Sequence, residues 1–191
     1  PWLPHGAIRH AGGQHFYHTI RALAERGHAV HVLCYGRGEC ADDIESLEAV
    51  CASLAVITPA YRWSQKLDHV RRGGWRRPWR IGRQTHEALR ERLRISCREE
   101  PIDVVHCTWT ETGRYLDAVP DGIGTVLGTQ DVEYRVRPRE VALYPRGWAR
   151  IQAGRRARYL IRNEPRWVRR ADVTLASSAA DRGYLTRLGG F

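Results

Sequence analysis

Three polar residues that follow one predicted strand are the first candidates for chemistry. Gln130, Asp131 and Glu133 come directly after residues 124–128, which are typical of a buried strand. A carboxylate can accept a proton during a reaction, whereas the Gln130 amide can donate a hydrogen bond but cannot titrate. Asp131 could equally cap the helix that follows, a common role for Asp at a strand-to-helix junction. Both roles stay open for Asp131.

A glycine pair near the N-terminus is the second candidate. Gly12 and Gly13 precede a helix predicted over residues 14–26, whose apolar residues recur on one face. Without side chains, backbone amides at a helix N-terminus can approach an anion such as a pyrophosphate. The alternative is a plain turn that needs a positive φ, which glycine adopts without strain.

Histidines cluster around the same loop, at positions 5, 10, 15 and 18. His15 and His18 are three residues apart on the predicted helix, a spacing that metal ligands can have. No set of Cys, Asp or Glu accompanies them. We therefore predict no metal site, and we expect solvated or substrate-facing histidines.

The stretch between Trp63 and Arg83 interleaves Trp with Arg. This pattern suits a membrane–water interface, where indole lies at the headgroups and Arg meets lipid phosphate. It also suits single-stranded nucleic acid, whose bases stack on Trp. A surface loop whose Trp side chains pack onto the domain is the third possibility.

Composition narrows the class of protein. The chain has 191 residues, a formal charge of +10 and 42% hydrophobic residues, and it contains no run of about 20 apolar residues. Its five Cys are odd in number and form no C-x-x-C pair, which argues against a zinc site and a disulfide framework and favours reduced cysteines in the cytoplasm. The basic charge attracts nucleic acid, anionic lipid or an anionic substrate without choosing among them.

Helices and strands alternate along the chain, which predicts an α/β fold with a doubly wound parallel sheet. We predict strands at residues 29–34, 54–58, 102–107, 124–128 and 173–176, and helices at 14–26, 42–52, 81–97, 148–162 and 179–188. Pro165 is expected to kink the chain or open a new turn. Ligands of such sheets bind beyond the carboxyl ends of the strands. The candidate loops are residues 4–15, 108–113, 129–135 and 177–181.

The ordered motifs closely resemble the N-terminal, acceptor-side domain of family 4 glycosyltransferases, a Rossmann-like half of the GT-B architecture. The resemblance begins with Pro1-Trp2-Leu3-Pro4, the Gly12-Gly13 pair and Arg26-Gly27-His28. Residues 128–134 look like the family's H-x-V-E-type motif at a strand end. The remaining matches follow the pattern R-x-L-x-x-x-E…A-D-V-x-x-x-S…D-x-x-x-L: Arg158, Leu160, Glu164, Ala171, Asp172, Val173, Ser177 or Ser178, Asp181 and Leu185.

The resemblance implies an enzyme that transfers a sugar from a nucleotide-sugar donor to a glycan, lipid-linked or small-molecule acceptor, with retained stereochemistry. It implies one domain over residues 1–191, a fragment that lacks the first strand and the C-terminal half, where most of the nucleotide binds. Little or no activity is then expected of the fragment alone. Neither a metal nor another cofactor is expected, and neither is a specific nucleic acid. Contact of Trp63–Arg83 with an anionic membrane would hold the enzyme at the cytoplasmic face.

The resemblance also assigns roles to residues. Gly12 and Gly13 would approach the donor phosphates. The catalytic group would comprise Gln130, Asp131 and Glu133, and the acceptor would meet His15, Trp109, Thr110 and Glu111. Many relatives have a His where this chain has Gln130, which leaves open whether Gln130 replaces a catalytic His.

A rival class is a non-catalytic Rossmann-like module that binds an anionic ligand, RNA or a membrane. A downstream α/β domain with an E-x7-E motif would favour the transferase, whereas salt-sensitive RNA binding without sugar-nucleotide binding would favour the rival. A nicotinamide-dependent dehydrogenase is disfavoured because no G-x-G-x-x-G follows a strand.

Overall fold

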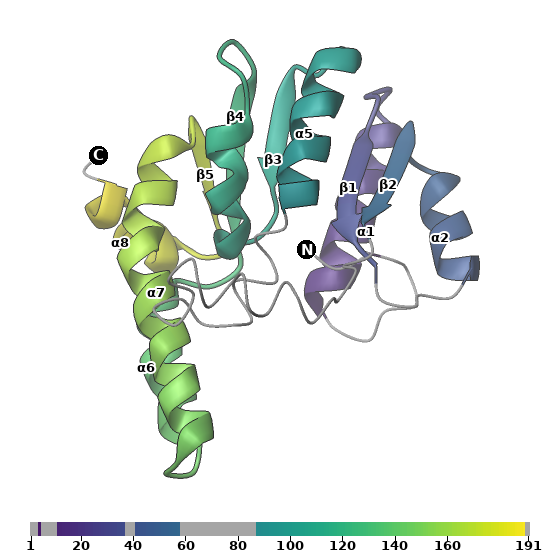
Figure 1. The fold of residues 1–191 in the computed structure, drawn as a ribbon. Helices are drawn as coiled ribbons and strands as arrows, with labels where there is room; N and C mark the ends of the chain where they lie inside the picture. The colour runs from purple at the N-terminus through teal and green to yellow at the C-terminus, as the bar shows by residue number, and fades with distance from the viewer. Residues whose placement is uncertain (1–3, 5–10, 37–40, 58–86, 190–191) are drawn as a thin grey trace. The chain divides into compact units, whose positions relative to one another are not determined.

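A computed structural model describes residues 4, 11–36, 41–57 and 87–189 of the chain (Figure 1). The chain divides into two compact units, residues 1–60 and residues 61–191. Every strand pair is parallel, and helices alternate with the strands in both units. The predicted α/β class, with parallel sheets and a Rossmann-like arrangement, is thereby confirmed.

The first unit is a small two-stranded sheet with its flanking helices. It comprises α1 (Ala11–Ala24), β1 (His31–Tyr35), α2 (Ala41–Glu48) and β2 (Ser53–Ile57). Cys34 of β1 and Leu47 of α2 are buried together, and Ile20 of α1 packs against them. Ile20 belongs to the apolar face from which the helix was predicted, so the periodicity located this core.

The start of α1 differs from the prediction. The helix begins at Ala11 rather than at Gln14, so Gly12 and Gly13 lie in its first turn, and Gly13 is buried. They therefore do not form a loop ahead of the helix. At the other end Gly27 has a φ of 85° and donates its N–H to Ala24, the helix-ending role expected of it.

The second unit is built on a three-stranded sheet with the order β3-β4-β5. Its elements are α5 (Glu87–Glu99), β3 (Val104–Cys107), the 3-10 helix η2 (Thr110–Ala118), β4 (Gly124–Thr129), α6 (Glu133–Leu143), α7 (Trp148–Arg170), β5 (Val173–Ala176) and α8 (Ala179–Gly189). The central strand β4 pairs Val126 with His106 on one side and with Val173 on the other.

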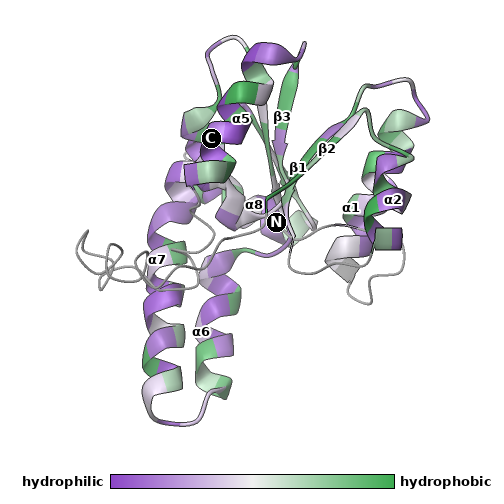
Figure 2. Ribbon diagram, turned by 45° about the vertical axis from the view of Figure 1, so that its right-hand side comes forward, coloured by the Kyte–Doolittle hydropathy of each residue, from purple (hydrophilic) through white to green (hydrophobic). Residues whose placement is uncertain are grey.

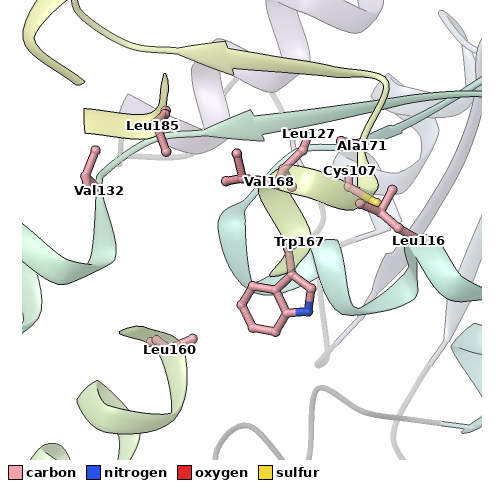
Figure 3. Close-up of a cluster of buried hydrophobic side chains, with 9 residues drawn as sticks. All are labelled: Cys107, Leu116, Leu127, Val132, Leu160, Trp167, Val168, Ala171 and Leu185. Atoms are coloured by element: carbon pink, nitrogen blue, oxygen red, sulfur yellow. The ribbon is translucent and has the colours of Figure 1, made fainter. Parts of the chain in front are cut away.

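The core of this unit lies between the sheet and α7, α8 and η2 (Figure 3). On α7, Leu160, Trp167 and Val168 fall on one face at helical spacing, and they share one buried cluster with Leu127 of β4 and Leu116 of η2. The cluster comprises Cys107, Leu116, Leu127, Val132, Leu160, Trp167, Val168, Ala171 and Leu185. Glu164 occupies the same stripe of α7 and is fully buried, which makes it the exception in an apolar face.

Helices α6 and α7 lie side by side as an antiparallel hairpin (Figures 1 and 2). This hairpin extends past the carboxyl ends of β4 and β5 (Figure 1). The prediction that α7 ends near residue 162 is wrong, because the helix continues through Pro165 to Arg170. Pro165 lacks the N–H that the helix ladder would use. The burial of Glu164, Trp167 and Val168 on either side of it supplies packing that outweighs this loss.

Candidate functional site

The loops after β3, β4 and β5 meet at the carboxyl edge of the second unit's sheet. The Thr110 hydroxyl donates to the carbonyl of Asp131 at 3.4 Å. From the other side, the Ser177 hydroxyl lies 2.8 Å from the carbonyl of Thr129 and 3.0 Å from that of Gln130. The loop after β4 is therefore tied to both neighbouring loops through its backbone, which leaves its side chains to other partners.

Gln130 and Asp131 present such side chains. Gln130 is half-buried and Asp131 is exposed, and within the described part of the chain neither side chain makes a hydrogen bond or an ion pair. The alternative role of Asp131 as a helix cap is wrong, because Val132 is the N-cap residue of α6 and no capping side chain comes from the loop. A neutral donor and a carboxylate thus lie next to each other at the sheet edge.

Glu133, the third predicted catalytic residue, has different surroundings. It is 3% exposed, and both of its carboxylate oxygens accept hydrogen bonds from the guanidinium of Arg137 one turn later on α6. Burial raises the pKa of Glu133, and the bonds to Arg137 oppose that rise. Its carboxylate is thus engaged within α6 rather than presented at the sheet edge.

Glu111 and Glu133 belong to one ionic cluster. The Glu111 carboxylate pairs with Arg156 of α7 and lies 3.9 Å from Arg137. Glu164 of α7 completes the ionic cluster, because its oxygens accept the backbone N–H groups of Glu133 at 2.8 Å and of Tyr134 at 3.4 Å. The helix α6 is therefore capped by a side chain from α7.

The acid–base state of Glu164 follows from this position. Burial, followed by the nearby charge of Glu133, raises the pKa of Glu164 from 4.5 to about 7, although the two backbone N–H groups favour the ionised form. With Glu140, which also pairs with Arg137, the ionic cluster contains four carboxyl groups and two arginines. A neutral Glu164 removes one unpaired negative charge from the interior.

Two further predicted acceptor residues line the start of η2. Thr110 is 3% exposed, and Trp109 is half-buried at the N-terminus of η2. The Thr112 hydroxyl donates to the Trp109 carbonyl at 2.6 Å, and its oxygen accepts the Trp109 N–H at 3.2 Å. The loop predicted over residues 108–113 is thus largely a buried 3-10 helix, which positions Trp109 rigidly.

The motif residues that carry the resemblance join elements of the second unit. Asp172 accepts the backbone N–H and the hydroxyl of Thr125 at 2.7 and 2.6 Å, which fastens the start of β5 to β4. Asp181 pairs with Arg135 of α6 at 3.0 Å and accepts the Ser178 hydroxyl at 2.6 Å. Together with Glu164 and Ser177, they fix the relative positions of the strand-end loops.

Gly12, Gly13 and His15 belong to the first unit. His15 is exposed on α1, with its ring against that of Phe16. Their roles at the donor phosphates and the acceptor stay predictions. His5, His10 and the stretch Trp63–Arg83 lie outside the described residues.

The His, Cys and carboxylate side chains of the described ranges are the candidates for metal and thiol chemistry. No group of three or more His, Cys, Asp or Glu that could hold a metal ion occurs there. Cys51, Cys97 and Cys107 are free thiols, and burial raises the pKa of the Cys107 thiol to about 12, which keeps it protonated near neutral pH.

The fold and this edge define a class: a parallel α/β domain with polar strand-end loops positioned to bind a ligand. The family model of the glycosyl transferase 4-like domain matches residues 11–191. The chain belongs to this family and hence to the glycosyltransferases. Comparison with curated proteins and with solved structures gave no significant match. No helix in the described ranges is long and apolar enough to cross a membrane.

Proposed function

We propose that the protein containing this chain transfers a sugar from a nucleotide-sugar donor to an acceptor hydroxyl, as a hexosyltransferase that retains the anomeric configuration. In this reaction the bond from the anomeric carbon to the donor phosphate breaks. A bond from that carbon to the acceptor oxygen forms, and the acceptor proton leaves with a base or with the departing phosphate. Family membership and the motif resemblance support this reaction.

The observation that carries the proposal is the pair of side chains on the loop after β4. Gln130 and Asp131 have no partner among the described side chains, while Thr110 and Ser177 hold their backbone. Such preorganisation is what a group acting on a substrate requires. Asp131 would accept or orient the acceptor hydroxyl proton, and Gln130 would donate a hydrogen bond to a sugar or acceptor oxygen.

The other predicted residues take supporting roles in this proposal. Glu133 and Glu111 would act through the ionic cluster, which sets the start of α6 against η2. Trp109 and His15 would contact the acceptor. Gly12 and Gly13 would offer backbone amides of the first turn of α1 to the donor phosphates.

An assay of the full-length protein tests this function. Release of nucleoside diphosphate from a panel of nucleotide sugars should require an acceptor. Asp131→Asn should lower kcat about a hundredfold, because it removes a group that handles a proton. Asp121→Asn is the matched control, since Asp121 is also exposed but precedes β4, at the opposite end of the strand. Equal activity of both variants would overturn the role of Asp131.

The family resemblance also leads us to expect little or no turnover from residues 1–191 alone, because the nucleotide would bind mainly to a C-terminal half. Comparing this chain with the full-length protein at the same concentration measures that difference. Equal turnover would contradict it.

A further inference from the structure

The free end of the α6–α7 hairpin is a surface that the proposed reaction does not use. Helix α6 ends at Leu143, and α7 starts at Trp148 after a turn in which Gly147 has a φ of 128°. Since α6 has 11 residues, the turn lies about 16 Å beyond the start of that helix. Because α6 follows β4 directly, this end lies on the side of the sheet that carries Gln130 and Asp131 (Figure 1).

Large apolar side chains are exposed at this end. Leu143 is 85% exposed, Trp148 is 69% exposed and Ile151 is 49% exposed. They lie within one turn of the α6–α7 connection, where Figure 2 shows hydrophobic residues at the end of the hairpin. Isolated apolar residues on a surface need no explanation, but three on one projecting end form a small apolar patch whose burial against a partner would be favourable.

All of the charged residues at this end of the hairpin are basic. Residues 141–152 include Arg146 and Arg150, both exposed, and no Asp or Glu. The nearest acidic residue before them, Glu140, is paired with Arg137. Residues 133–170 as a whole contain 12 Arg and three Glu. We call Leu143, Arg146, Trp148, Arg150 and Ile151 the hairpin tip.

Trp, aliphatic side chains and Arg around an exposed turn are the combination that suits the surface of an anionic bilayer. Indole and aliphatic groups enter the headgroup region, and guanidinium groups bind lipid phosphates. A second copy of the chain is a poor occupant, because it would oppose Arg146 and Arg150 with the same charges. The charge of the hairpin tip therefore favours lipid over self-association.

We propose that the hairpin tip binds the surface of anionic phospholipid bilayers by inserting Trp148 and Leu143 among the headgroups while Arg146 and Arg150 contact phosphate. Binding in this orientation presents the carboxyl edge of the second unit's sheet to the membrane. The hairpin tip shares no residue with the stretch Trp63–Arg83, and the proposal does not depend on glycosyl transfer.

Vesicle flotation of the full-length protein tests the proposal. The protein should float with vesicles of equal parts phosphatidylcholine and phosphatidylglycerol, and it should remain in solution with phosphatidylcholine alone. The double variant Arg146→Ala/Arg150→Ala should bind the anionic vesicles roughly 30-fold more weakly, since each Arg near the surface contributes about a factor of five. The double variant Leu143→Ala/Trp148→Ala should lose at least about tenfold.

Arg162→Ala/Arg166→Ala is the matched control. It removes the same charge from exposed positions of α7 that lie at least about 18 Å from Arg150 along the helix, beyond the screening length of roughly 8 Å at physiological salt. This variant should bind within about threefold of the parent. Unchanged circular dichroism and melting temperature establish that the tip variants fold.

Three results would overturn the proposal. One is the absence of binding to anionic vesicles, and the second is binding that the tip variants leave unchanged. The third is sedimentation that shows a dimer broken by Leu143→Ala/Trp148→Ala without vesicle binding, since this outcome would assign the hairpin tip to an interface between copies.

Discussion

The backbone N–H of Glu133 donates to the Glu164 carboxylate at 2.8 Å, across 31 residues of sequence. Through this bond α7 caps the helix that starts directly after Gln130 and Asp131. The cap is a buried carboxyl group rather than the exposed Ser, Thr or Asp that usually precedes a helix. The position of the candidate loop therefore depends on the ionisation and packing of a residue in the core.

The raised pKa of Glu164 makes stability depend on pH. Below about pH 4.5 the folded and unfolded chains both hold this proton. Between pH 4.5 and about 7 only the folded state keeps this proton, so the free energy of unfolding falls as the pH rises. The total fall is at most on the order of 3 kcal/mol, and the free energy of unfolding is constant above about pH 7. Urea unfolding at several pH values measures this slope.

Glu164→Gln supplies the comparison for that measurement, because Gln cannot ionise. The free energy of unfolding of the parent relative to this variant should decrease between pH 4.5 and 7 and stay constant on either side. Other titrating groups largely cancel in the difference. A constant difference over the whole range would show that folding does not raise the pKa of Glu164.

Arg156 is expected to matter for stability far more than arginines on the surface. Arg156 and Glu111 are 21% and 12% exposed, and the second carboxylate oxygen of Glu111 is buried without a partner among the described residues. Arg156→Ala would leave Glu111 largely unneutralised, at a cost of about 3 kcal/mol. Chemical denaturation of the variant measures this loss.

The control for Arg156 is Arg21→Ala, which breaks the ion pair with Glu25 on α1. Both side chains of that pair are more than half exposed, so the expected loss is below about 0.5 kcal/mol. Replacing Arg156 and Glu111 together by Met and Leu should recover most of the stability, because no buried charge then lacks a partner. Equal losses for Arg156→Ala and Arg21→Ala would contradict the burial argument.

Gly113 is predicted to be essential for the packing of η2 against α7. A Cβ at this position would lie 2.7 Å from the Cβ of Trp167 and 3.2 Å from Leu127 Cδ1, so Gly113→Ala should cost about 1–3 kcal/mol. Gly183→Ala in α8 is the matched control: nothing lies within 4 Å of its added Cβ, and Ala favours a helix, so stability should rise by up to about 1 kcal/mol. The melting temperatures of both variants, compared with that of the parent, measure these changes in stability.

The sequence predicted most of the regular elements because their signals are local. The apolar face that contains Ile20 located α1, and the short run at residues 173–176 gave the bounds of β5. Helix α6 was expected only as a helix after Asp131, without bounds, because Pro138 and a weak apolar pattern hide its extent. Its contacts with α7, including the cap from Glu164, come from residues distant in sequence.

The sequence predicted where the candidate site lies, but it did not predict how the side chains of the site contact one another. The rule that ligands bind at strand ends selected the loops that contain Gln130, Asp131 and Trp109. That Glu111 and Glu133 face arginines in an ionic cluster was not predictable from the sequence, because Arg137 and Arg156 look like ordinary surface charges along a basic chain. Only the tertiary contacts between α6, α7 and η2 distinguish them.

Ser177 is predicted to act on catalysis through the loop that it holds. Ser177→Ala removes the hydroxyl shared by the carbonyls of Thr129 and Gln130, which frees one side of the loop. In the full-length enzyme, kcat should fall about tenfold or more with a smaller change in the donor KM, since the positioning of reacting groups affects the transition state most. Ser177→Thr keeps the hydroxyl and should restore most of the activity.

Ser178, the neighbour of Ser177, provides the control. Ser178 binds Asp181 at the start of α8 and makes no contact with the loop after β4 among the described hydrogen bonds. Ser178→Ala should therefore cost about 1 kcal/mol of stability through the lost helix cap and leave kcat unchanged. If Ser178→Ala lowers kcat as much as Ser177→Ala does, the effect belongs to α8 as a whole and the tie from Ser177 to Gln130 is not what positions the loop.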